Sequence, residues 1–190
     1  MKCVCGGKRS TLKTTWINRA SALSDSLKLV GRAVFFTLLM PGTVSIFIPY
    51  FILHPDLARS VERLTVFQIG AGTIGLAGFT VLIYSIWGFA LHGKGTLAPI
   101  DPPRTLVVRG LYRHTRNPMY IGVLTILLAE SALFQSTVLL TYAGTVFVLF
   151  HLFVIAYEEP HLSAKFGEQY TRYCRAVPRW WVTIKPFQEA

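Results

Sequence analysis

The sequence predicts an all-α, polytopic membrane protein with about four transmembrane helices and a cytoplasmic C-terminal helical cap. Its 190 residues are 52% hydrophobic and only 15% charged, whereas soluble domains usually carry about a quarter charged residues. Its apolar residues gather in long uncharged runs, and a helix needs about 20 such residues to cross a bilayer. Its basic residues lie at the ends of these runs, as membrane topology would place them.

The apolar runs define the expected elements, which follow a basic N-terminal segment, residues 1–32. That segment is either an interfacial helix or a basic tail that orients the first span. We expect the rest of the chain, residues 33–190, to form one membrane domain. Its four spans are expected at about 33–53, 64–91, 119–134 and 138–157. The last two spans lie on either side of Gln135-Ser136, with only residues 135–137 between them, so we expect them to form a tight hairpin.

The second span is rich in glycine, and two interpretations are open for it. Close approach of a neighbouring helix is typical of small residues in membrane helices. A glycine-lined groove for a ligand is the alternative. The residues concerned are Gly70, Gly72, Gly75 and Gly78.

The distribution of lysine and arginine predicts the orientation of the chain. The polar segments 1–32, 92–117 and 158–190 hold 17 of the 19 basic residues. Four spans put these three segments on one side, which the positive-inside rule makes cytoplasmic. Both termini of this integral membrane protein are therefore expected in the cytoplasm. The basic residues form no continuous stripe, so we expect no nucleic-acid partner. We expect membrane lipids as partners.

Two polar clusters flank the hairpin and would meet on the cytoplasmic side. Asn117 and Pro118 make a good helix start, where the asparagine would cap the helix and free N–H groups would attract an anion. Glu158 and Glu159 end the last span, where they either form salt bridges with the basic loop or hold a ligand. A further helix is expected from His161 to about Arg175.

Other candidate groups are weaker. The tyrosines near the clusters could hold a cation on their aromatic faces or form an interfacial belt. The histidines show no metal-ligand spacing, so no metal site is expected. Glu130 is the one charge between Met119 and Tyr157. A carboxylate inside a span is energetically expensive, which makes Glu130 a secondary functional candidate near the far end of the hairpin.

Six ordered motifs from about Gly93 to Arg179 resemble the isoprenylcysteine carboxyl methyltransferase family and the related phosphatidylethanolamine N-methyltransferases. They are Gly-x-Gly-Thr, Leu-Val-x-x-Gly-x-Tyr, Arg-Asn-Pro-Met-Tyr-x-Gly, Glu-Glu-x-x-Leu, Phe-Gly-x-x-Tyr and Val-Pro-Arg. Those families are integral membrane enzymes that use S-adenosylmethionine. The resemblance therefore implies methyl transfer from S-adenosylmethionine to a lipid-soluble acceptor at the cytoplasmic membrane face.

The resemblance also implies which residues contact the cofactor, and it leaves the catalytic residues unassigned. The residues expected to contact the cofactor precede the basic loop, start the third span and end the fourth. They are Arg104, Thr105, Leu106, Val107, Tyr112, Asn117, Pro118, Met119, Tyr120, Glu158 and Glu159.

Two positions depart from the family pattern. Asn117 stands where many members have histidine, and Val154 stands where the isoprenylcysteine enzymes have an arginine for the substrate carboxylate. The acceptor thus remains open between a lipophilic small molecule and a lipidated substrate, and between O, N, S and C as the methylated atom. The alternatives are an NADPH-dependent membrane reductase similar to sterol reductases and a non-catalytic membrane scaffold whose basic segments bind anionic lipid.

Overall fold

A computed structural model of the chain describes residues 38–53, 65–93 and 105–188. Their helices run in the order η1 (Leu38–Phe47), α2 (Ile48–Leu53), α3 (Val66–Gly93), η2 (Gly110–Arg113), α4 (Pro118–Leu133), α5 (Thr137–Phe153), η3 (Val154–Glu158) and α6 (Glu159–Ala176). η1 and η3 are π-helical, and η2 is a short 3-10 helix. The N-terminal segment 1–32, the loop 54–63 and Arg104 lie outside the described residues.

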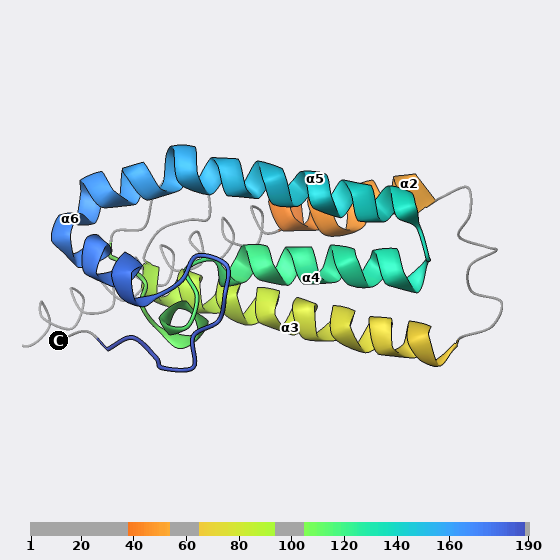
Figure 1. Ribbon diagram of the computed structural model, residues 1–190, viewed down its shortest axis with the longest axis horizontal. Coiled ribbons are helices and arrows are strands. Elements are labelled where there is room, and N and C mark those ends of the chain that lie inside the picture. The colour runs from red at the N-terminus through yellow and green to blue at the C-terminus, as the bar shows by residue number, and fades with distance from the viewer. Residues whose placement is uncertain (1–37, 54–64, 94–104, 189–190) are drawn as a thin grey trace, which may run out of the picture.

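The helices lie where the apolar runs predicted them, so the all-α prediction is confirmed for the described part of the chain. α4 lies between α3 and α5, and the three helices run side by side (Figure 1). Their shared core contains two side chains from each helix. These are Leu82, Ile86, Val123, Leu127, Ala143 and Val146.

Two helices are long and apolar enough to cross a membrane, Val66–Phe89 and Thr137–Ala176. Only 22% of the residues in the most apolar stretch of each are buried. A core helix of a soluble protein would instead be mostly buried, and extended apolar surface marks contact with a membrane or a partner. The apolar helices Leu39–Leu53 and Pro118–Leu133 are shorter.

Glycine brings α3 and α4 into close contact. A Cβ added at Gly78 would lie 2.9 Å from Thr125, and one at Gly122 would lie 2.9 Å from the backbone nitrogen of Leu82. The prediction of close helix approach is therefore confirmed for Gly78 and for Gly75, whose added Cβ would lie 3.2 Å from Ala129. At these two glycines α4 fills the space that a ligand groove would need.

The predicted helix from His161 to about Arg175 is wrong at its start. α6 begins at Glu159 and continues the helical path of α5 and η3 through Pro160. Pro160 cannot donate a hydrogen bond to the preceding helical turn, and the π-helical turn η3 lies directly before it.

Gly167 breaks α6 into two parts. Its φ of 53° and ψ of −124° are non-helical, and such backbone angles favour glycine because a side chain would clash. The chain turns at this end of the bundle, so the second half of α6 runs back towards the loop before α4 (Figure 1). There Tyr170 and Tyr173 pack with Val108 and Val177 in a second small core.

Candidate functional site

A cavity of about 210 Å³ lies where the start of α4 meets η3 and α6. Most of the residues expected to contact a cofactor line it: Leu106, Val107, Tyr112, Asn117, Pro118, Met119, Tyr120, Glu158 and Glu159. Thr105 is exposed and is not among the lining residues. Arg104 precedes the described part of this loop. The fold thus brings the two polar clusters together at one end of the apolar bundle.

Aromatic side chains form much of the cavity wall. Tyr112 and Tyr120 were expected there, whereas Phe89, Phe153 and Tyr157 were not singled out from the sequence. The signal that could have found the last two is their spacing of four residues along one helix, because residues four apart share a face. Their rings stack with centroids 5.2 Å apart.

Glu158 faces the cavity and accepts a hydrogen bond from Tyr120, whose Oη lies 2.9 Å from Oε1 of the carboxylate. The bond joins the first turn of α4 to the last residue of η3. Burial raises the pKa of Glu158 above its usual value, and the charge of Glu159 adds to this increase, while the hydrogen bond from Tyr120 opposes it. Glu158 is therefore the more easily protonated member of the acidic pair.

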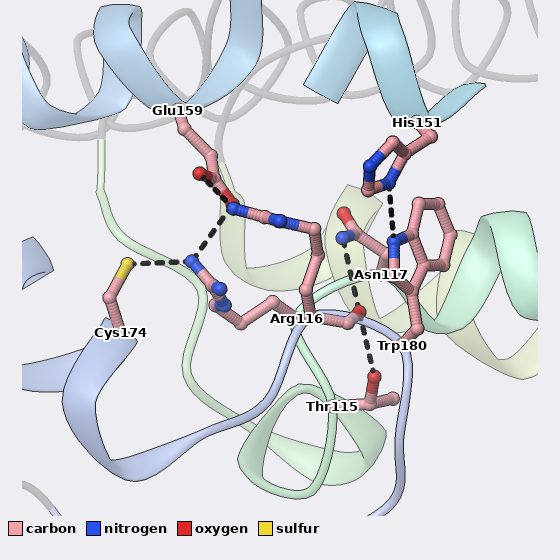
Figure 2. A network of polar contacts seen from close by, with 8 residues as sticks. Thr115, Arg116, Asn117, His151, Glu159, Cys174 and Trp180 are labelled. Atoms are coloured by element: carbon pink, nitrogen blue, oxygen red, sulfur yellow. Dashed lines mark hydrogen bonds and ion pairs between the residues drawn. The ribbon is translucent and has the colours of Figure 1, made fainter. Parts of the chain in front are cut away.

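Glu159 is neutralised by two arginines (Figure 2). Arg179 donates to both carboxylate oxygens, each over 2.7 Å, and Nη1 of Arg116 lies 2.9 Å from Oε1. Burial raises the pKa of Glu159, but the hydrogen bond from Arg179 and the two guanidinium charges outweigh it, so the pKa lies below its usual value. The same Nη1 donates to the sulfur of Cys174 over 2.8 Å.

The side chain of Asn117 does not cap α4, so that prediction is wrong. Asn117 precedes the first residue of the helix, but it makes no side-chain cap bond. Its Nδ2 instead donates to the carbonyl of Arg179 over 3.2 Å, and Thr115 Oγ1 donates to the same oxygen over 3.3 Å. A tertiary contact has therefore taken the side chain that a local cap would have used.

These bonds come from a C-terminal segment, Val177–Phe187, which we call the strap. Its backbone pairs with the loop before α4: the Pro178 carbonyl accepts from the N–H of Arg116 over 3.0 Å, and the N–H of Thr183 donates to the carbonyl of His114 over 2.9 Å. Further along, Trp180 Nε1 donates to Nδ1 of His151 on α5 over 3.0 Å (Figure 2). The sequence indicated no partner for His151, because nothing local predicts where the strap lies.

One weaker candidate, Glu130, lies outside this arrangement. Glu130 sits in the last turn of α4, at the end away from the cavity, and is not among the lining residues. Its Oε2 is buried with no hydrogen-bond partner among the described residues. Within the same described residues, no cluster of three or more His, Cys, Asp or Glu side chains could hold a metal ion.

The model of the phospholipid methyltransferase family matches residues 67–169, which is more than half of the chain. The chain belongs to the phospholipid methyltransferase family. Membership implies methyltransferase activity on lipid substrates. The matched region begins in α3, extends into α6 and includes the start of α4 and η3, which line the cavity. No curated protein and no solved structure matches the chain significantly.

Proposed function

We propose that this phospholipid methyltransferase transfers a methyl group from S-adenosylmethionine to a lipid acceptor at the cytoplasmic face of a membrane. The observation that carries the proposal is the cavity itself. It combines aromatic walls with the Tyr120–Glu158 pair at one end of an apolar helical bundle. A polar cofactor and an apolar acceptor can both reach such a position.

The residues of the cavity fit the chemical groups of S-adenosylmethionine. Glu158 offers a carboxylate that can accept hydrogen bonds from an ammonium or from ribose hydroxyls. Nε of Arg116 is buried and has no hydrogen-bond partner within the described part of the chain, so it can donate to a carboxylate. The rings of Tyr112 and Tyr157 can stabilise a sulfonium, because aromatic faces attract cations.

Methyl transfer requires the protein mainly to position the cofactor and the acceptor. When bound, S-adenosylmethionine supplies a methyl group on a sulfonium, so transfer is an in-line displacement at carbon. Tyr120 orients Glu158, Glu158 holds the cofactor, and the aromatic walls exclude water and align the acceptor. A lone-pair-bearing acceptor needs no further acid or base at the moment of transfer.

Val154 bears on the choice of acceptor. It lines the cavity and is only 2% exposed. The isoprenylcysteine enzymes have an arginine at this position, and valine offers no charge to a carboxylate. We therefore propose a lipid acceptor other than a prenylated cysteine. An acceptor without a carboxylate needs no cationic partner at this wall of the cavity.

The proposal includes a membrane arrangement. Residues 33–190 form one domain whose four apolar segments cross the bilayer, with the cavity at the cytoplasmic end. The exposed apolar surface of α3 and α5 supports the crossing, and the excess of basic residues in 1–32, 92–117 and 158–190 supports the orientation.

Calorimetric titration of the purified full chain with S-adenosylhomocysteine tests the proposal. We expect saturable binding that the Glu158→Gln variant weakens at least tenfold, because the carboxylate charge is lost while the side-chain shape is kept. Glu168→Gln is the matched control, since Glu168 is an exposed residue of α6, and it should bind like the wild type. Binding of NADPH in place of S-adenosylhomocysteine by the folded protein would support a reductase and overturn the proposal, and salt-sensitive lipid binding alone would support a scaffold.

A further inference from the structure

We propose that the strap, Val177–Phe187, is a membrane-docking element whose exposed apolar side chains insert into the interfacial layer of the bilayer. This surface is separate from the cavity, and the inference does not depend on methyl transfer. The partner is the lipid surface itself. Three side chains carry the contact: Trp181, Val182 and Ile184.

The position of Trp180 sets the depth of the strap. Its ring lies 5.3 Å from that of Phe147 and 6.0 Å from that of His151, and both partners belong to the apolar helix α5. His151 precedes Glu158 by two helical turns, which is about 10 Å along the axis at 1.5 Å per residue. The strap therefore runs beside the apolar part of α5, about two helical turns away from the polar end of this helical path at Glu158.

The residues that follow Trp180 present apolar surface outward. Trp181 is 80% exposed, Val182 is 67% exposed and Ile184 is 94% exposed. Three such side chains within four residues would be unfavourable in water, since burying each is worth about 1.5–3 kcal/mol. Tryptophan is enriched at the level of lipid headgroups, and the exposed Lys185 beside them suits anionic headgroups.

The protein cannot bury these side chains by rearranging the strap locally, because hydrogen bonds hold its backbone. The Pro178 carbonyl, the Thr183 N–H and the Phe187 N–H are all bonded to the loop before α4. Nε of Arg113 adds a bond to the carbonyl of Phe187 over 2.7 Å. The apolar side chains are thus held outward in a fixed geometry.

The apolar surface of α5 continues beside the strap's anchor. Val148 and Leu152 flank His151 in the sequence of this helix and are 52% and 56% exposed. In a membrane these side chains contact lipid. A strap anchored on the same helix turns therefore reaches the boundary between the acyl chains and the headgroups, where an amphipathic segment binds best.

Docking would connect the bilayer to the wall of the cavity. The carbonyl of Arg179 accepts from Asn117 and Thr115, and the guanidinium of Arg179 binds Glu159. A strap bound at the lipid interface would therefore hold two cavity-lining residues, Asn117 and Glu159, in position.

Fluorescence quenching of the full chain in phosphatidylcholine–phosphatidylglycerol vesicles tests the inference. The signal of Trp181 is obtained as the difference between the wild type and Trp181→Phe. We expect this signal to be blue-shifted relative to tryptophan in water. Lipids brominated high on the acyl chain should quench it more strongly than lipids brominated near the chain end, and aqueous iodide should quench it weakly.

Trp87→Phe supplies the matched control, because Trp87 is 63% exposed on α3, a helix that is apolar enough to cross the membrane. The Trp87 signal should also respond to brominated lipid. Circular dichroism establishes that both variants are folded. A Trp181 signal that emits as in water and is quenched by iodide would overturn the inference. A signal that neither quencher reaches would do the same, because it would mean that protein covers the strap.

Discussion

Tyr120 Oη donates a hydrogen bond of 2.9 Å to Oε1 of Glu158, so the start of α4 is tied to the end of η3 at the cavity. The neighbouring carboxylate, Glu159, is held by two arginines instead. Two adjacent residues of one helical path therefore have different surroundings: a neutral donor orients one, and positive charge neutralises the other. This division leaves Glu158 as the carboxylate available to a ligand.

Tyr120→Phe is expected to weaken the binding of S-adenosylhomocysteine about fivefold. The variant removes the hydrogen bond but keeps the ring, which lies 4.5 Å from the ring of Phe150, and a typical hydrogen bond contributes about 1 kcal/mol. Calorimetric titration measures the change. Tyr84→Phe is the control, because Tyr84 is 58% exposed on α3. Equal affinity of Tyr120→Phe and the wild type would show that the bond does not orient the ligand-binding carboxylate.

The sequence predicted the helices well because the signals for them are local. The uncharged run at about 64–91 corresponds to α3, and the runs at about 119–134 and 138–157 correspond to α4 and to α5 with η3. Their ends coincide with Pro118 and with the Gln135–Ser136 turn, whose Ser136 accepts a capping bond from the N–H of Leu139. Apolar run length and turn residues are sufficient for such elements.

The sequence did not predict the strap, because its contacts join residues far apart in the chain. Asn117 has the sequence pattern of a helix cap, yet its side chain donates to the carbonyl of Arg179. His151 has no partner near it in the sequence, yet it accepts a hydrogen bond from Trp180. The cavity residues expected from the motifs were found together because the hairpin connects them. Phe89 reaches the same cavity from α3, and no motif marks it.

The two adjacent carboxylates should affect stability with opposite dependence on pH. The pKa of Glu159 is lowered in the folded state, so its stabilising effect is complete above the unfolded value of about 4.3 and is lost as the pH falls through the folded pKa. The pKa of Glu158 is raised, so stability from its protonated form is complete below about 4.3 and is lost as the pH rises through the folded pKa.

At neutral pH, Glu159→Gln should therefore lower the melting temperature, and Glu158→Gln should raise it. The Glu158→Gln difference should shrink as the pH falls through the raised folded pKa towards about 4.3, whereas the Glu159→Gln difference should persist down to about 4.3 and shrink only below it. Thermal unfolding in one detergent across this pH range measures the effect. Two variants that shift the melting temperature in the same direction at neutral pH would contradict the assigned environments.

Arg179→Lys should destabilise the folded state by about 1–2 kcal/mol. Arg179 binds both oxygens of Glu159, and a lysine ammonium cannot reproduce this planar, two-point contact. The side chains are 28% and 21% exposed, so water screens the pair only in part. Chemical or thermal unfolding measures the loss. Arg172→Lys, at an exposed position of α6, should leave stability unchanged, and an equal loss in both variants would rule out the two-point contact as the cause.

Gly122→Ala should destabilise the bundle by about 1–3 kcal/mol, the usual effect of overpacking. An added Cβ at Gly122 would meet backbone atoms of α3, the nitrogen of Leu82 at 2.9 Å and the carbonyl oxygen of Gly78 at 3.0 Å. Backbone atoms cannot move aside as a flexible side chain can, so α3 and α4 would have to separate. Because α4 starts at the cavity, this separation should also weaken the binding of S-adenosylhomocysteine.

Gly144→Ala provides the matched comparison for this prediction. Gly144 lies inside α5, and no heavy atom lies within 4 Å of an added Cβ there. Alanine favours helix over glycine by about 1 kcal/mol, so this variant should be as stable as the wild type or more stable. Thermal unfolding of both variants separates close packing from helix propensity. If Gly122→Ala were as stable as Gly144→Ala, the glycine contact between α3 and α4 would not be what sets their separation.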